Sequence, residues 1–218
     1  MVGQWKSRRG AADTSDDEDV AATLDRSCPF SNCMVTAKLS HAPIGHYLLV
    51  SMRVLAIDAS LRNSGVAIIE VNGGKFNTLY FGVIHNPSAL RMSSCLVAIR
   101  DRLTELIQTY EPDCCALESV IYVQSYKTAI TLGAARGSAI MAATERGLPV
   151  FEYAPKRIKQ ATVGNGSADK AQVAFMVRAL LSLTETPADD AADALAIGLT
   201  HLRAQEGARL GLPGQLQI

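Results

Sequence analysis

The segment from Arg53 to Asp58 is the feature that most constrains how this chain can fold. Its central residues, Val54 to Ile57, are apolar without alternation, which is typical of a strand buried on both faces. Such a strand lies inside a sheet that helices cover on each side. The strand ends on Asp58, so a carboxylate follows a buried element, where a charge is costly unless a partner compensates it.

The order of the elements after this strand predicts an α/β fold. Strands expected at residues 65–71 and 78–85 flank a turn at Asn72 to Gly74 and form an antiparallel hairpin. Helices and strands then alternate: we expect helices at 90–110, 127–146, 168–183 and 187–204, and strands at 114–118 and 150–153. This order predicts a mixed five-stranded sheet with helices on both faces.

Composition divides the chain into three parts. Residues 1–51 contain the acidic run Asp16 to Asp19 and show no sustained periodicity, so we expect a disordered N-terminal extension. An alternative is that translation starts at Met52. The globular domain is expected over residues 52–205, followed by a flexible tail over residues 206–218.

Charge and cysteine content exclude some classes of protein. Lys and Arg number 21 and Asp and Glu number 21, so any affinity for DNA must come from local basic clusters. The five cysteines are odd in number and two are adjacent, which indicates reduced thiols in a cytoplasmic protein. Cys28 and Cys33 lack the second Cys or His pair of a zinc finger. The longest apolar stretch, residues 47–57, falls short of the ~20 residues of a membrane helix.

Four carboxylates occupy positions from which they could meet. Glu118 ends the strand at 114–118 as Asp58 ends the first strand. Thr186 and Pro187 resemble an N-cap followed by proline at the first helical position, which places Asp190 and Asp193 three apart on one helix face.

If these side chains converge, they cannot all stay ionised unless divalent cations neutralise them, and Mg²⁺ prefers such oxygen ligands. We therefore expect two Mg²⁺ ions per subunit, which Mn²⁺ can replace. Two ions would activate a water, hold a phosphate and stabilise the leaving 3′ oxygen, and the predicted reaction is phosphodiester hydrolysis.

Each carboxylate also has a purely structural explanation. Acidic residues at strand ends often cap the next loop or pair with lysine, and acidic residues at a helix start offset the helix dipole. Asp189 is a rival to Asp190, because it precedes Asp193 by four positions, yet as the third helical residue it suits a capping box. We assign Asp189 to capping and Asp190 to the metal site.

Three segments resemble the RuvC family, the bacterial Holliday-junction resolvases. They are Met-Arg-Val-Leu-Ala-Ile-Asp at 52–58, Ala-Leu-Glu at 116–118 and Asp-Ala-Ala-Asp at 190–193. The likeness continues through 132–137, 147–153, 163–166 and 193–197, and covers about residues 52–203 in the same order.

The resemblance implies a ribonuclease H-like fold and a homodimer that nicks a four-way DNA junction symmetrically in recombination and repair. It also implies the branch-migration proteins RuvA and RuvB as partners. Its implied catalytic, metal-binding residues are Asp58, Glu118, Asp190 and Asp193. The chain departs from the family pattern at Ala59-Ser60, where Pro-Gly is usual, and at Ile121, where a Phe is usual.

Candidate DNA contacts come from one aromatic residue and four basic ones. Tyr122, next to Ile121, is the candidate to stack on an unpaired base, although core packing explains it equally well. Basic side chains that could bind phosphates, or simply form a solvated helix face, are Lys156, Arg157, Lys159 and Lys170. Of these, Lys159 and Lys170 match DNA-binding lysines of the family.

A stripe of small residues from Gly133 to Met141 would let another helix approach closely, either within the chain or across a dimer interface. Two other functions remain open. A junction-binding protein without catalysis would follow if Ala59-Ser60 had altered the site. An ATP-binding relative would need glycine-rich phosphate loops, which this sequence lacks.

Overall fold

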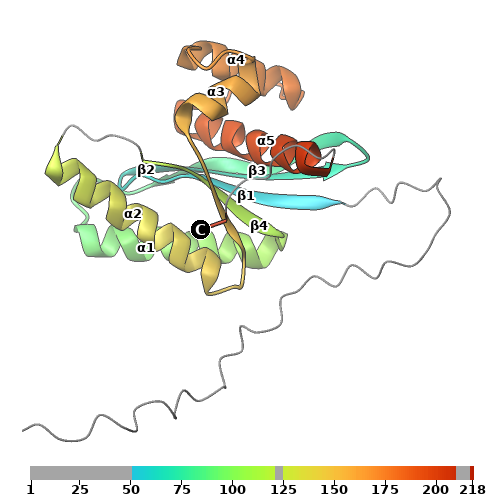
Figure 1. The fold of residues 1–218 in the computed structure, drawn as a ribbon. Helices are drawn as coiled ribbons and strands as arrows, with labels where there is room; N and C mark the ends of the chain where they lie inside the picture. The colour runs from blue at the N-terminus through green and yellow to red at the C-terminus, as the bar shows by residue number, and fades with distance from the viewer. Residues whose placement is uncertain (1–50, 121–124, 210–216) are drawn as a thin grey trace, which may run out of the picture. The chain divides into compact units, whose positions relative to one another are not determined.

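One mixed sheet organises the part of the chain that the computed structural model describes, residues 51–120, 125–209 and 217–218 (Figure 1). The strands are β1 (Met52–Asp58), β2 (Asn63–Asn72), β3 (Lys75–His85), β4 (Cys114–Glu118) and β5 (Val150–Tyr153). The helices are α1 (Met92–Tyr110), α2 (Tyr126–Thr144), α3 (Pro155–Val163), α4 (Lys170–Leu180) and α5 (Asp189–Arg209). The extension expected to be disordered lies, apart from Ser51, outside these residues.

The order of strands in the sheet is β3-β2-β1-β4-β5. The first three strands pair antiparallel, whereas β1 pairs parallel with β4 and β4 with β5. Parallel strands share a direction, so the carboxyl ends of β1, β4 and β5 lie at one edge of the sheet. That edge carries Asp58, Glu118 and Tyr153.

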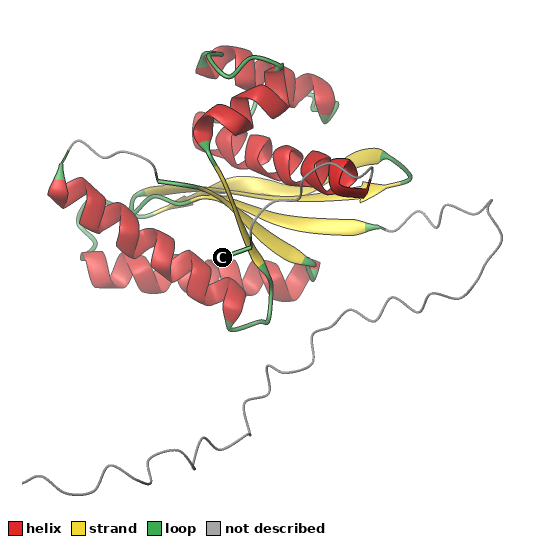
Figure 2. Cartoon of the chain, viewed as in Figure 1, coloured by secondary structure: helices red, strands yellow, loops and turns green. Residues whose placement is uncertain are grey.

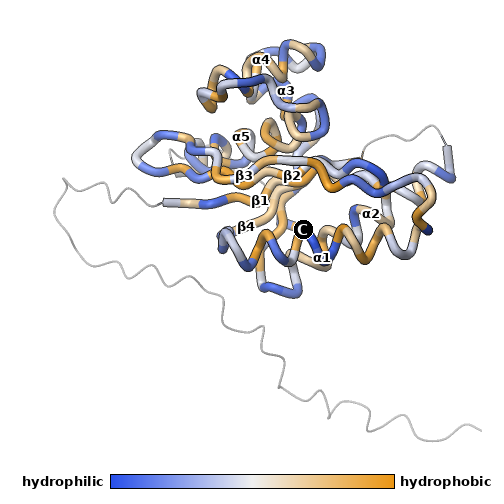
Figure 3. The backbone as a smooth tube through the Cα atoms, turned by 180° about the vertical axis from the view of Figure 1, so that it is seen from behind, coloured by the Kyte–Doolittle hydropathy of each residue, from blue (hydrophilic) through white to orange (hydrophobic). Residues whose placement is uncertain are grey.

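Helices cover both faces of this sheet, as the sequence predicts (Figure 2). Successive residues of β1 point to opposite sides: Leu55 and Ile57 join a core with α1 and α2, whereas Val54 and Ala56 join a core with α3, α4 and α5. The central strands are accordingly among the most hydrophobic stretches of the chain (Figure 3). The α/β fold class and the mixed five-stranded sheet are confirmed.

A glycine lets α5 lie unusually close to the sheet. A Cβ atom built on Gly198 would stand 2.8 Å from Cδ1 of Ile69 and 3.2 Å from Cβ of Ala56. Neighbouring residues on the buried side of α5 are also small, since Ala194 and Ala196 are buried. The helix that carries Asp190 and Asp193 therefore packs directly on β1 and β2.

Three details differ from the sequence-based expectation. The helix α3 was not predicted, although Pro155 at its start and Gly164 in the left-handed conformation (φ 85°) at its end are ordinary helix boundaries. Its helical pattern is weak, because Lys156, Arg157 and Lys159 are basic and only Ile158 and Thr162 are buried.

The last helix begins later than Thr186 and Pro187 suggest. Its first turn is closed by the Ala192 N–H, which donates to the Ala188 carbonyl at 2.8 Å, so Ala188 rather than Thr186 occupies the cap. Pro187 is instead buried in the connection before the helix. Asp189 is thus the first helical residue rather than the third, and its predicted capping-box role is wrong.

The boundary of the predicted tail is also wrong, because α5 continues past Gln205 to Arg209. At the very end, Gln217 bridges to Phe151, and the Ile218 N–H donates to the Val150 carbonyl at 2.9 Å. The C-terminal residues thereby pair with β5. Within the described ranges, no helix is long and apolar enough to cross a membrane.

Candidate active site

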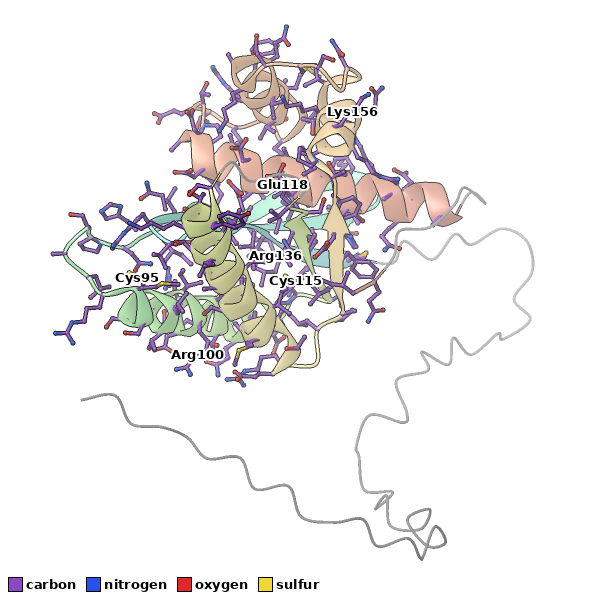
Figure 4. The ribbon with its side chains drawn as sticks, turned by 60° about the vertical axis from the view of Figure 1, so that its left-hand side comes forward. Cys95, Arg100, Cys115, Glu118, Arg136 and Lys156 are labelled. Atoms are coloured by element: carbon purple, nitrogen blue, oxygen red, sulfur yellow. The ribbon has the colours of Figure 1, made fainter. Side chains whose placement is uncertain are left out.

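The edge of the sheet where the parallel strands end brings the predicted carboxylates together. Asp58 ends β1 and Glu118 ends the neighbouring strand β4. Both line a cavity of about 230 Å³ that Asp193 of α5 also lines. Asp190 lies one turn earlier on α5, close enough for its charge to act on Asp58. Figure 4 shows Glu118 at this end of the sheet, near α5.

Gly65 is what allows the start of α5 to reach this edge. It pairs with Asp58 across the β1–β2 ladder. A Cβ atom at position 65 would stand only 1.8 Å from the carbonyl oxygen of Asp190. Only glycine admits so close an approach, so Gly65 seats Asp190 beside Asp58. The sequence analysis missed this role, because Gly65 reads there as an ordinary first residue of a strand.

Burial and mutual repulsion disturb the ionisation of two of these carboxylates. Burial, reinforced by the charges of Asp193 and Asp190, raises the pKa of Asp58 to about 6. Burial, reinforced by Asp58 and Asp193, raises the pKa of Glu118 to about 7. Lys170 opposes both shifts without cancelling them. The cluster therefore holds more negative charge than its protein surroundings compensate.

Lys170 supplies the one ion pair recorded for these carboxylates in the described structure. Its Nζ lies 3.0 Å from Oδ2 of Asp193, and its side chain remains 71% exposed. The hydrogen bond and charge of Asp193 raise the pKa of Lys170. An exposed pair of this kind contributes little stability, so a cation of higher charge can displace the ammonium group.

The donor set suits a hard divalent cation. All four side chains offer carboxylate oxygens, the ligands that Mg²⁺ prefers. The pKa values of Asp58 and Glu118 are raised by burial and by neighbouring carboxylates, and a bound cation would offset both effects. As the side chains are arranged, no three acidic, histidine or cysteine groups among the described residues are disposed to hold a metal ion. A bound cation would compete with the Lys170 ammonium group for Asp193.

Arg136 is a second residue that sequence reasoning missed at this site. Its guanidinium donates to the backbone carbonyl of Glu118 and pairs with Glu152 of β5. It lines a larger cavity of about 450 Å³ together with Asp58 and Glu118. Burial lowers the pKa of Arg136. Arg136 thus connects α2 to the C-terminal parts of β4 and β5. The only feature of the sequence that pointed to Arg136 is its place in the segment 132–137, which resembles the family.

Ala59 and Ser60, which depart from the family pattern, line the same larger cavity. They follow Asp58 directly, and the Ser60 N–H donates to Oγ of Ser64 at 3.1 Å. This hydrogen bond holds the short loop after β1. Ala59 and Ser60 therefore face the space beside the carboxylates.

The four predicted basic residues fall into two pairs. Lys159 and Lys170 line the smaller cavity beside the carboxylates. Lys156 and Arg157 lie further out on α3 and are exposed. The Arg157 guanidinium carbon lies 5.9 Å from the centre of the Tyr153 ring. Tyr122 and Ile121 lie outside the described residues, so the stacking role of Tyr122 stays a prediction.

Comparisons with known proteins bear on what this site does. The sequence model of the family described as crossover junction endodeoxyribonuclease RuvC matches residues 54–201. A protein of that name from Akkermansia muciniphila is 53% identical over 151 residues, which cover 69% of this chain and 90% of the relative. Its namesake from Teredinibacter turnerae is 42% identical over 157 residues, covering 70% of this chain and 89% of the relative.

Solved structures agree with these sequence relatives. The structure titled T. thermophilus RuvC in complex with Holliday junction substrate is similar with a TM-score of 0.69 and 34% identity, over 76% of this chain and 99% of that chain. The yeast mitochondrial Holliday junction resolvase Ydc2 is similar with a TM-score of 0.52 over 73% of this chain and 82% of its own. At 16% identity, that second likeness concerns the fold alone.

The burial of Asp58 and the repulsion from its neighbours predict that replacing Asp58 by Asn stabilises the metal-free protein at high pH. A carboxyl whose pKa is raised by folding stabilises the native state below its unfolded pKa, and this contribution is lost as pH rises through the folded value of about 6. We expect Asp58→Asn to exceed the native protein by about 2 kcal/mol in free energy of unfolding at pH 8. The advantage should shrink toward pH 4. Urea unfolding in EDTA at both pH values measures it.

Added Mg²⁺ provides the control for this experiment, since a bound cation should stabilise the native protein more than the Asp58→Asn variant. A variant that is less stable than the native protein at pH 8 in EDTA would contradict the proposed repulsion.

Proposed function

The chain belongs to the RuvC family of crossover junction endodeoxyribonucleases, and from this premise we propose that its carboxylate cluster is the nuclease site that resolves Holliday junctions. The family consists of metal-dependent nucleases with a ribonuclease H-like fold. The observation that supports the assignment most directly is that four carboxylates from β1, β4 and α5 gather at one sheet edge inside the matched region 54–201. The reaction is hydrolysis of phosphodiester bonds during recombination and DNA repair.

The residues that would hold the metal are Asp58, Glu118, Asp190 and Asp193. We propose two Mg²⁺ ions per subunit, with Mn²⁺ able to replace them, because one divalent cation would leave part of the cluster's negative charge uncompensated. When bound, such ions lower the pKa of a water molecule, polarise the phosphoryl group and stabilise the leaving 3′ oxygen.

The basic side chains then prepare the substrate. Lys170, which pairs with Asp193 and is largely exposed, would bind a phosphate of the DNA strand. Lys159 lies beside Glu118 and would bind the same strand. Lys156 and Arg157, further out on α3, would bind phosphates of a junction arm. The strand is thereby held across the carboxylate edge, with Tyr122 as the candidate to stack on an unpaired base.

Symmetric resolution requires two such sites, and an exposed stripe on α2 is the surface we propose for the homodimer. The large residues of the stripe are exposed apolar side chains: Tyr126 (93%), Ile130 (68%) and Met141 (56%). Between them, Cβ atoms built on Gly133 and Gly137 would meet nothing within 4 Å. Members of the stripe recur every three or four residues, so they share one helix face that is open to a second copy.

Other residues of α2 face inward. Ser138 donates to the Leu96 carbonyl of α1 at 2.6 Å, and Ala135, Ala139 and Ala142 are buried. The predicted small-residue stripe thus divides into an inward part that packs within the chain and an outward part available for a partner. By family membership we further propose RuvA and RuvB as partners and the cytoplasm as the place of action.

A pair of neighbouring aspartates tests the nuclease site. We expect Asp190→Asn to lower Mg²⁺-dependent cleavage of a labelled four-way junction by roughly 10²-fold, because it removes a metal ligand. Asp189→Asn is the matched control, since Asp189 is exposed at the start of the same helix and, unlike Asp190, is not among the charges that raise the pKa of Asp58. It should cleave within a few-fold of the native protein.

Native protein in EDTA and a linear duplex of the same sequence complete this assay. Equal losses in both variants would refute the assignment of Asp190. Tight junction binding by the native protein without cleavage in Mg²⁺ or Mn²⁺ would instead favour a non-catalytic junction-binding protein.

The dimer proposal predicts that Gly133→Leu weakens self-association. The position is open, so the larger side chain should leave the protomer folded while holding two α2 helices apart. We expect the dimer dissociation constant, measured by analytical ultracentrifugation, to rise about tenfold or more, equivalent to ~1.4 kcal/mol. Gln108→Leu, on an exposed position of α1, adds apolar surface elsewhere and should change nothing. A dimer that is unchanged by Gly133→Leu would exclude this face.

A further inference from the structure

A buried histidine connects α5 to two strands of the sheet. Nδ1 of His201 lies 2.8 Å from Oη of Tyr153, and Nε2 lies 3.2 Å from Sγ of Cys114. All three side chains are buried, and His201 is fully so. The imidazole also stacks near Phe151, with ring centres 4.8 Å apart. We call His201, Tyr153 and Cys114 the histidine clamp.

The hydrogen-bonding capacity of the imidazole is fully used by this arrangement. Burial lowers the pKa of His201 to about 4, so the ring is neutral near neutral pH and has one donor and one acceptor nitrogen. Each nitrogen faces one partner, whichever tautomer is present. Hydrogen bonds of this kind are directional, so they fix both the ring and the helix that carries it.

The packing of α5 combines apolar burial with this directional contact. Its buried residues include small ones, such as Ala194, Ala196 and Gly198, and large ones, which are Leu195, Ile197, Leu199 and Leu202. Burial of apolar surface is itself non-directional. The hydrogen bonds of His201 therefore add a directional restraint on the rotation of α5 to the apolar packing.

Each partner of His201 belongs to a strand that leads to the carboxylate edge. Cys114 begins β4, the strand that ends on Glu118. Tyr153 pairs with Glu118 across the β4–β5 ladder, and its carbonyl accepts the Ser119 N–H at 2.9 Å. His201 follows Asp190 by about three helical turns, which puts the two side chains on similar sides of α5.

We propose that His201, held by Tyr153 and Cys114, is a positioning residue that sets the rotation of α5 and so places Asp190 and Asp193 against Asp58 and Glu118. This role rests on the proposed function, because it concerns the same carboxylates. His201 touches neither cavity at the site and acts only through the helix. Tyr153 extends the connection to α3, since its ring lies under Arg157.

Tyr153→Phe is the most selective test, because it deletes one hydroxyl and keeps the ring that contacts His201 and Arg157. We expect the affinity for Mn²⁺ to weaken about tenfold, an effect of the size seen when a residue that supports a metal ligand is lost. Electron paramagnetic resonance of free Mn²⁺ measures this affinity. Single-turnover cleavage of a four-way junction should fall by a similar factor. Junction affinity in EDTA should stay unchanged, because the basic residues are untouched.

Thr200→Val is the matched control. Thr200 is a buried neighbour on α5, but its hydroxyl donates to the Ala196 carbonyl of the same helix at 2.7 Å and does not link α5 to the sheet. Its removal should lower thermal stability and leave Mn²⁺ affinity as in the native protein. A purely structural role for the clamp would make both variants behave alike, with lower stability and unchanged Mn²⁺ affinity, and that result would overturn the proposal.

A double-mutant cycle tests whether the tyrosine acts through the histidine. If it does, Tyr153→Phe should have little further effect on Mn²⁺ affinity in a His201→Phe background. Additive losses would overturn the link between the two residues. Mn²⁺ affinity tests whether the clamp positions the carboxylates, and it does so independently of turnover. A native protein that bound Mn²⁺ without cutting junctions would refute the proposed function, and the effect of the clamp on Mn²⁺ affinity could still be measured.

Discussion

Repulsion among carboxylates at one sheet edge is the constraint on which the rest of the structure depends. Asp58 and Glu118 are carried there by parallel strands, and α5 adds Asp190 and Asp193. Burial, and after it the mutual repulsion of these charges, raises the pKa values of Asp58 and Glu118. The fold opposes that separation through rigid elements packed on both faces of the sheet.

Several contacts away from the carboxylates serve this arrangement. Gly65 and Gly198 let α5 lie against the strands, Arg136 holds the end of β4, and His201 is bonded to β4 and β5. None of them adds a carboxylate to the site. Together with apolar packing they hold the charged side chains of α5 close to those of the sheet, and a divalent cation would relieve the resulting repulsion.

The sequence predicted those parts of the site that depend on local pattern. Apolar runs that end on Asp58 and Glu118 mark buried strands, and the spacing of Asp190 and Asp193 places them on one helix face whether the helix starts at residue 187 or 189. The two-residue error at that start arose because Pro187 resembles a first helical residue but instead lies buried in an otherwise exposed connection before the helix.

Contacts between distant segments could not be predicted in this way. The need for glycine at position 65 arises only when Asp190, far away in the sequence, packs on it. His201 lies within an apolar helix, where a lone histidine gives no sign of its partners, and Cys114 resembles an ordinary strand residue. The short helix α3 was missed because its three basic residues, Lys156, Arg157 and Lys159, outnumber its two buried ones.

The most direct test of the account is anomalous diffraction from crystals grown with Mn²⁺. The account predicts manganese peaks bounded by carboxylate oxygens of Asp58, Glu118, Asp190 and Asp193, with the Lys170 ammonium group displaced from Asp193. No peak at these residues, with the Lys170–Asp193 pair intact in protein that cleaves junctions in the same Mn²⁺ solution, would contradict it.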